Sequence, residues 1–223
     1  MSPRFDLLVF DWDGTLMDSI ATIVDCTLDA LSRLDGVVPP PRERVREAIG
    51  RGRRASMDLF SPGCSEAVRA DLVEVYRELW IGTYRDRPAL LPGARETLTA
   101  LGRAGYQLGV ATAKSRRGLD RELAATGLAP RFAATRTVDE APPKPHPGML
   151  LGLCEELGVS PERTLMIGDT TFDLDMARAA GAAALGVLTG SHDRERLAGS
   201  APLAVLADVV AVPAWLGGGA TAS

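Results

Sequence analysis

Cysteine and histidine are scarce in this 223-residue chain, which has three cysteines and two histidines. Cys26, Cys64 and Cys154 are widely spaced and form no Cys-x-x-Cys pair, so neither a disulfide framework nor a zinc knuckle is expected. His146 and His192 complete no metal-ligand set with them. We interpret the three thiols as packing groups.

The sequence also lacks an excess of basic residues and any long apolar run. It has 25 Lys and Arg residues and 29 Asp and Glu residues, which gives a formal net charge of −4. A surface that binds nucleic-acid phosphates needs an excess of basic residues. No apolar run is long enough to span a bilayer, and no signal-peptide-like segment follows Met1. We therefore expect a cytoplasmic protein without nucleic-acid or membrane partners.

The most informative segment lies near the N-terminus, where the apolar run 7–10 leads directly into Asp11-Trp12-Asp13-Gly14-Thr15. An apolar run without alternation suits a strand buried on both faces of a parallel sheet, and ligands bind beyond the carboxyl ends of such strands. Side chains two positions apart in extended backbone point the same way. Asp11 and Asp13 can therefore converge on one group of substrate atoms, with Gly14 allowing a sharp turn after them.

Residues 19–85 show helical periodicity and contain no convincing strand. Because this segment separates the first strand from the later strands, we predict a helical cap inserted into the core rather than a part of the sheet. The expected helices cover residues 19–33, 42–49, 55–60 and 66–84.

From residue 91 onward the pattern becomes that of βαβ units, which predicts an α/β fold with a Rossmann-like, doubly wound parallel sheet. The core then comprises residues 1–18 and 86–216, and the glycine-rich end, 217–223, is expected to be a frayed tail. Strands are expected over residues 106–111, 132–134, 164–167 and 183–187, and helices over 94–103, 116–126, 148–157 and 172–180.

Three later clusters follow strands of this predicted sheet, so they belong to the same edge as Asp11. Thr112 offers a hydroxyl that could bind oxyanion oxygens, or could cap the next helix. Lys144 lies between prolines that restrict the backbone, which suits either a fixed positive charge in a site or a rigid surface loop. Asp169 repeats the position of Asp11 after an apolar strand, whereas Asp173 could equally favour the dipole of the following helix.

A bare cage of acids would repel a phosphate dianion, so these residues imply a hard divalent cation. Oxygen ligands and retained waters fit Mg²⁺ better than zinc. Together with Lys144, the cation would neutralise charge on a transferring phosphoryl group.

The ordered motifs resemble those of the haloacid dehalogenase-like superfamily, from Phe5 to about Leu197, and most closely its phosphoglycolate phosphatase-like branch. The resemblance implies a Rossmann-like core with a helical C1 cap, and a phosphatase acting on a small phosphorylated metabolite. It rests on Phe10-Asp11-Trp12-Asp13-Gly14-Thr15-Leu16, Thr112, Lys144 before Pro145, and Gly168-Asp169-Thr170-Thr171-Phe172-Asp173.

The same resemblance implies the roles of the acids. Asp11 would be the nucleophile that forms an aspartyl-phosphate, and Asp13 the acid and base that serves the leaving alcohol and then water. Mg²⁺ would be held by the Asp11 carboxylate, the Asp13 backbone carbonyl and Asp169, with Asp173 supporting the site from behind.

The remaining groups would bind the phosphoryl oxygens. Thr112 and the amide of Ala113 would contact these oxygens, and Lys144 would pair with both Asp11 and the phosphate. Relatives often have Asn or Gly where this chain has Ala113, so any side-chain contribution at that position is missing.

Substrate choice is expected from the cap, where Arg51, Arg53 and Arg54 could bind a carboxylate or second phosphate, or simply form a solvated basic turn. Phosphoglycolate is a hypothesis on this basis. The alternative enzyme is a sugar-phosphate mutase with the same two aspartates, and the non-enzyme alternatives are a phosphoacceptor signalling module and an inactive binding protein. The sequence predicts no oligomeric state.

Overall fold

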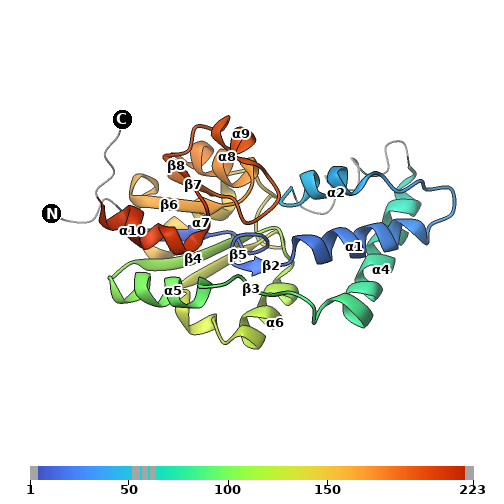
Figure 1. Cartoon of the computed structure of the whole chain (residues 1–223), viewed down its shortest axis with the longest axis horizontal. Helices are drawn as coiled ribbons and strands as arrows, with labels where there is room; N and C mark the ends of the chain where they lie inside the picture. Colours follow the sequence, from blue (N-terminus) through green and yellow to red (C-terminus); the bar gives the residue numbers. More distant parts are fainter. Residues whose placement is uncertain (1–4, 52–55, 57–59, 61–63, 219–223) are drawn as a thin grey trace.

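The computed structural model describes residues 5–51, 56, 60 and 64–218. Its centre is a six-stranded parallel sheet with the strand order β5-β4-β1-β6-β7-β8 (Figure 1). From β1, the chain fills one side of the sheet with β4 and β5 and then the other with β6, β7 and β8. The order reverses beside β1, and such a reversal opens a crevice at the carboxyl edge.

The strands confirm the predicted α/β class, with one shift and one addition. The expected strand at 132–134 lies instead at 134–137, because Phe132 precedes it as a loop side chain that packs into the core. The short edge strand β8 was not predicted. The strands are β1 (Leu7–Phe10), β4 (Gln107–Thr112), β5 (Ala134–Thr137), β6 (Thr164–Gly168), β7 (Ala183–Val187) and β8 (Ala204–Leu206).

Helices cover both faces of this sheet, as the doubly wound prediction requires. Residues of α5, α6 and α10 pack on one face, and residues of α7, α8 and α9 pack on the other. Successive residues of β1 alternate between these two cores, which explains its uninterrupted apolar run. The bounds are α5 (Ala94–Arg103), α6 (Arg116–Thr126), α7 (Gly148–Leu157), α8 (Thr171–Ala180), α9 (Arg194–Ala198) and α10 (Val212–Gly217).

The inserted segment forms a separate helical layer at one end of the sheet, on the right in Figure 1. It comprises α1 (Ile20–Ser32), α2 (Arg42–Ala48) and α4 (Glu66–Leu79), and the last turn of the expected 66–84 helix is a π-helix, η1 (Trp80–Tyr84). These elements pack around a core of their own. Most of the helix expected at 55–60 lies outside the described residues.

The chain enters and leaves this helical layer through a small antiparallel pair, β2 (Met17–Asp18) with β3 (Ala89–Leu90). The domain boundaries at 18/19 and 85/86 stay a prediction, as does the tail from 217, whose first residue ends α10 and whose last five lie outside the described part of the chain. Among the described residues, no helix has the length and apolar character needed to cross a bilayer.

Candidate active site

Asp11 leaves the carboxyl end of β1 and is almost completely buried, with 4% of its surface exposed. Its amide donates to the carbonyl of Ile167 on β6 at 2.9 Å, which extends the ladder and fixes the backbone. Gly14 then turns the chain with a φ of 81°, a value that favours glycine. A Cβ on Gly14 would lie 2.7 Å from an Asp169 oxygen, so this turn also admits Asp169 to the site.

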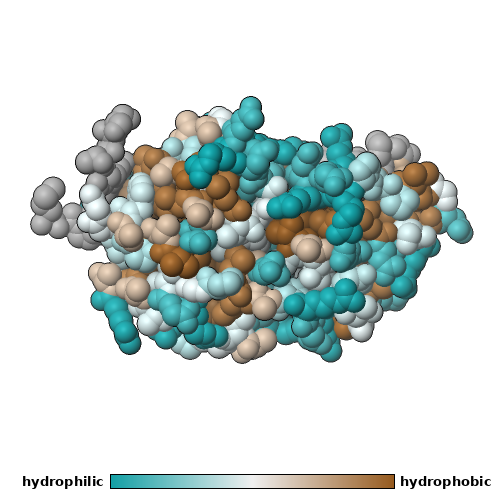
Figure 2. All heavy atoms as spheres, viewed as in Figure 1, coloured by the Kyte–Doolittle hydropathy of each residue, from teal (hydrophilic) through white to brown (hydrophobic). Residues whose placement is uncertain are grey.

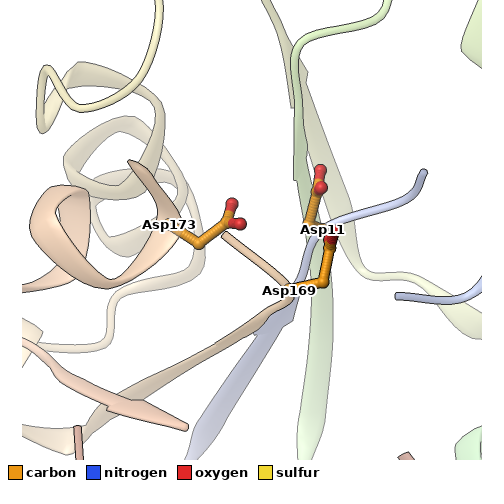
Figure 3. Close-up of side chains that lie close together, drawn as sticks. All are labelled: Asp11, Asp169 and Asp173. Atoms are coloured by element: carbon orange, nitrogen blue, oxygen red, sulfur yellow. The ribbon is translucent and has the colours of Figure 1, made fainter. Parts of the chain in front are cut away.

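Three acids meet at this edge. Figure 3 shows the carboxylates of Asp11, Asp169 and Asp173 directed into one space, and one oxygen from each lies within 4.8 Å of the others. All three residues are buried. Asp11 follows β1, Asp169 follows β6, and Asp173 comes from the first turn of α8, so the predicted convergence of strand ends brings the first two together.

Lys144 is the positive charge among these acids. Its side chain is wholly buried, and its Nζ lies 2.8 Å from Asp11 Oδ1 and 2.6 Å from Asp173 Oδ1. Burial by itself lowers the pKa of Lys144, but the two carboxylates outweigh this effect and raise that pKa above its ordinary value. Lys144 is therefore protonated and partly compensates the cluster.

The acids remain undercompensated. Burial raises the pKa of Asp11 to about 7, even though Lys144 opposes the shift. Burial and the nearby charges of Asp11 and Asp173 also raise the pKa of Asp169 well above its ordinary value. A buried set of oxygen donors with one lysine between them fits a hard divalent cation such as Mg²⁺.

Asp169 and Asp173 accept hydrogen bonds from different groups. Asp169 accepts hydrogen bonds from Thr15 Oγ1 at 2.9 Å and from the Ser191 amide at 2.8 Å, which fix its direction. Asp173 accepts from the amide and hydroxyl of Thr170 at 3.1 and 2.7 Å, forming the capping box of α8 while it also binds Lys144. Asp173 therefore caps α8 and contacts Lys144 with the same side chain, and its role in supporting the site stays a prediction.

Asp13 belongs to a second charge network that the sequence analysis missed. Lys114 Nζ lies 2.9 and 3.1 Å from the Asp13 carboxylate oxygens and 3.0 Å from Glu122 Oε1, and Ser19 Oγ donates to Asp13 at 2.6 Å. Trp12 donates to Glu122 at 2.5 Å and is itself fully buried in the hydrophobic core. Burial by itself lowers the pKa of Lys114, but the two carboxylates raise it to about 12.

A signal for Lys114 was present in the composition. The chain has 25 basic residues of the Lys and Arg types, yet only Lys114 and Lys144 are lysines, and each contacts one of the paired aspartates. No comparable signal marks Glu122, which stands among other charged residues of α6.

Thr112 ends β4 and is buried beside the acids. Its hydroxyl accepts from the Lys114 amide at 3.2 Å, and it does not cap the following helix, since Ser115 is the N-cap of α6 and accepts from Gly118 at 3.3 Å. Thr112 and Ala113 line the same cavity as Asp11, Asp13 and Lys114. The geometry therefore presents these groups together to a small molecule.

The arginines of the predicted specificity loop are placed only in part. The Arg51 guanidinium carbon lies 4.8 Å from the centroid of the Phe172 ring, and Arg51 is not among the described residues that line the cavity. Arg53 and Arg54 lie outside the described residues. A role for the three arginines in substrate binding stays a prediction.

Comparisons with known proteins agree with this geometry. The family model described as haloacid dehalogenase-like hydrolase matches residues 8–187. A protein named phosphoglycolate phosphatase from Vibrio vulnificus (strain YJ016) is 32% identical over 222 residues, covering 93% of this chain and 97% of its own. "Probable phosphatase IndB" of Dickeya dadantii (strain 3937) is 36% identical over 209 residues, covering 90% of this chain and 88% of its own.

The fold has matching solved structures as well. The crystal structure of a predicted phosphoglycolate phosphatase from Haemophilus somnus 129pt superimposes with a TM-score of 0.84 at 26% identity, covering 96% of this chain and 99% of that one. Family model, relatives and fold agree with the motifs gathered around Asp11. The chain therefore belongs to the haloacid dehalogenase-like hydrolases, in their phosphoglycolate phosphatase-like branch.

Proposed function

We propose that this enzyme is a Mg²⁺-dependent phosphatase that hydrolyses a small phosphate monoester through an aspartyl-phosphate on Asp11. The observation that carries the proposal is the position of Asp11, which is bound by Lys144 on one side, faces the acid cluster, and lines a cavity together with Asp13. Nucleophile, proton donor and charge compensation are thus within one small space.

In the first step, a carboxylate oxygen of Asp11 attacks phosphorus, the bond between phosphorus and the ester oxygen breaks, and Asp13 donates its proton to the departing alcohol. In the second step, Asp13 takes a proton from water as the water oxygen attacks phosphorus. The bond to Asp11 then breaks and inorganic phosphate leaves. Thr112 and the Ala113 amide would hold phosphoryl oxygens throughout, and Lys144 would keep Asp11 and the phosphate together.

The Asp11 and Asp169 carboxylates and the Asp13 backbone carbonyl would hold Mg²⁺. When bound, the cation supplies positive charge that offsets repulsion between the acids and the phosphoryl oxygens. Lys144 cannot perform this task alone, since burial still holds the pKa of Asp11 at about 7.

The test is phosphate release from a panel of phosphate monoesters, with Mg²⁺ and with EDTA. The panel includes phosphoglycolate because a relative of this chain is named phosphoglycolate phosphatase. Sugar phosphates and nucleotides complete the panel. We expect release that depends on Mg²⁺ and disappears in Asp11→Asn. Isomerised sugar phosphate without phosphate release would establish a mutase instead, and release from no ester would favour an inactive or signalling protein.

A matched control separates chemistry from folding. Asp11→Asn replaces a carboxylate by an amide of nearly the same size. Asp18→Asn makes the same replacement at an exposed aspartate on β2. Asp18→Asn should keep full turnover. Phosphate release by Asp11→Asn at the rate of the unchanged enzyme would overturn the nucleophile assignment.

A further inference from the structure

The cavity over Asp11 changes character along its length. Its floor is polar and consists of Asp11, Asp13, Thr112 and Lys114 at the sheet edge. The side opposite is built by the cap and is largely apolar. This wall includes Ile23, Val45, Ile49, Leu72, Tyr76 and Trp80.

The apolar wall comes from three helical elements of the cap: α1, α2 and the run of α4 into η1. Val45 and Leu72 are almost fully buried, so they form a built surface rather than scattered exposed side chains. On the face seen in Figure 2, apolar atoms also gather between α1 and α2. The cavity volume is about 270 Å³, near the lower end of small-molecule sites.

Two aromatic rings of the wall, Tyr76 and Trp80, adjoin the polar floor at Lys114. Tyr76 and Trp80 are stacked, with ring centroids 6.0 Å apart and planes 11° apart. Lys114 Nζ lies 5.4 Å from the centroid of Trp80 while it binds Asp13, so the polar floor passes into the aromatic wall at this lysine. An alcohol that takes its proton from Asp13 as it leaves phosphorus would lie against these rings.

Such a wall disfavours a small charged alcohol. A carboxylate held against these apolar side chains loses hydration without a partner. Arg51 stacks on Phe172 and does not line the cavity. Four other cations among the described residues do line it, but Lys114 is bound to Asp13 and Glu122, Arg77 is bound to Glu74, and Arg117 and Arg121 belong to α6 rather than to the apolar wall. A hydrocarbon group gains instead, by about four-fold in binding for each methylene it buries.

We infer that the alcohol part of the substrate is bulky and mainly apolar, such as an aromatic or alicyclic group, rather than glycolate. This inference rests on the proposed phosphatase function and names its substrate class. Polar residues of α6 and its N-cap also line the cavity, namely Arg117 and Arg121 within the helix and Ser115 at its N-cap, and none of them belongs to the apolar wall.

The experiment compares kcat/KM for primary alkyl phosphates, in which leaving-group chemistry is nearly constant: ethyl, butyl, cyclohexylmethyl and 2-phenylethyl phosphate, with phosphoglycolate alongside. We expect kcat/KM to rise by about four-fold per methylene until the cavity is filled, and to favour 2-phenylethyl over ethyl phosphate by at least about 50-fold. Phosphoglycolate should be no better than ethyl phosphate.

A variant of the wall ties the preference to these residues. In Trp80→Ala, the ratio of kcat/KM for 2-phenylethyl phosphate to that for ethyl phosphate should fall by at least about ten-fold. The ratio is independent of the folded fraction of the sample, so partial misfolding cannot mimic this result. Glu78→Ala, an exposed residue of α4 that does not line the cavity, should leave the ratio unchanged.

The outcomes separate the two levels of argument. Phosphate release that is equal across the alkyl series, or that favours phosphoglycolate, would overturn the apolar substrate class and leave the phosphatase intact. Release from no ester would overturn the phosphatase itself. A size preference that Trp80→Ala leaves unaltered would refute the assignment of the aromatic wall.

Discussion

Replacing Lys144 by methionine removes one buried positive charge and leaves the shape of the side chain nearly unchanged. In the native protein, Nζ of Lys144 bridges Asp11 and Asp173 at 2.8 and 2.6 Å, and no part of its side chain is exposed. The variant leaves both carboxylates buried without that partner, beside Asp169. We expect a large loss of stability that arises from electrostatics rather than from a cavity.

Removing one partner of a buried ion pair costs about 3–5 kcal/mol. In a protein of this size each kcal/mol corresponds to about 2–4 °C, so Lys144→Met should melt about 6–20 °C lower than the native protein. Part of the cost can be relieved by protonation. Since the pKa of Asp11 is already about 7, its carboxyl takes up a proton readily once the lysine is gone, and the loss should be smaller at low pH.

The assay is thermal unfolding followed by circular dichroism, in EDTA so that bound cations do not mask the change. Arg33→Met is the control, because it removes an exposed ion pair with Asp29 that is worth at most about 1 kcal/mol. Adding Asp173→Asn to Lys144→Met should restore part of the loss, with a coupling of about 0.5–3 kcal/mol. A Lys144→Met protein no less stable than Arg33→Met would refute the reasoning.

Three further predictions concern the same region. A free Mg²⁺ concentration of about 100 times Kd should raise the melting temperature of EDTA-treated protein by about 5–11 °C, and calorimetry should show less than half of this rise in Asp169→Asn. Lys114→Met should lower kcat by about 10- to 100-fold with little change in KM, as steady-state kinetics would show, because Asp13 loses the ammonium that holds it; unchanged kcat would contradict this. Burial lowers the pKa of His192, whose Nδ1 accepts from the Thr171 amide at 3.0 Å. The unfolded chain therefore binds more protons below about pH 6.5, so stability should fall as pH decreases through that value, and the melting temperatures of native protein and His192→Asn should converge between about pH 7 and 5.

The sheet and the acid cluster could be predicted because a single regularity governs both. An apolar run followed by Asp identifies a strand end, and parallel strands share one carboxyl edge, so Asp11 and Asp169 had to meet. The edge of the fold was less predictable. Strand β8 and helices α9 and α10 are short, and their few apolar residues gave no clear period.

The network around Asp13 needed three-dimensional information. Lys114 lies in the connection between β4 and α6, and its contacts join Asp13, which follows β1, to Glu122 on α6, a pairing that no spacing in the sequence marks. Likewise, helical periodicity shows which residues of the cap are apolar but not what they contact. Val45, Leu72 and Tyr76 pack in the core of the cap and also line the cavity. Both positions favour apolar residues at helical spacing, so the sequence pattern does not distinguish them.

The use of lysine rather than arginine at both aspartates has a physical explanation. A lysine ammonium is a compact charge that can lie between two carboxylates, as Lys144 does between Asp11 and Asp173, whereas a planar guanidinium needs a wider site. Lys144 is surrounded by packed residues on all sides, so an arginine there would displace the acids that it has to compensate. Lys114 is less enclosed, with 11% of its side chain exposed, and stands where the cavity opens toward the cap. Arginine should therefore be tolerated better at position 114 than at position 144, although the two lysines make the same kind of contact.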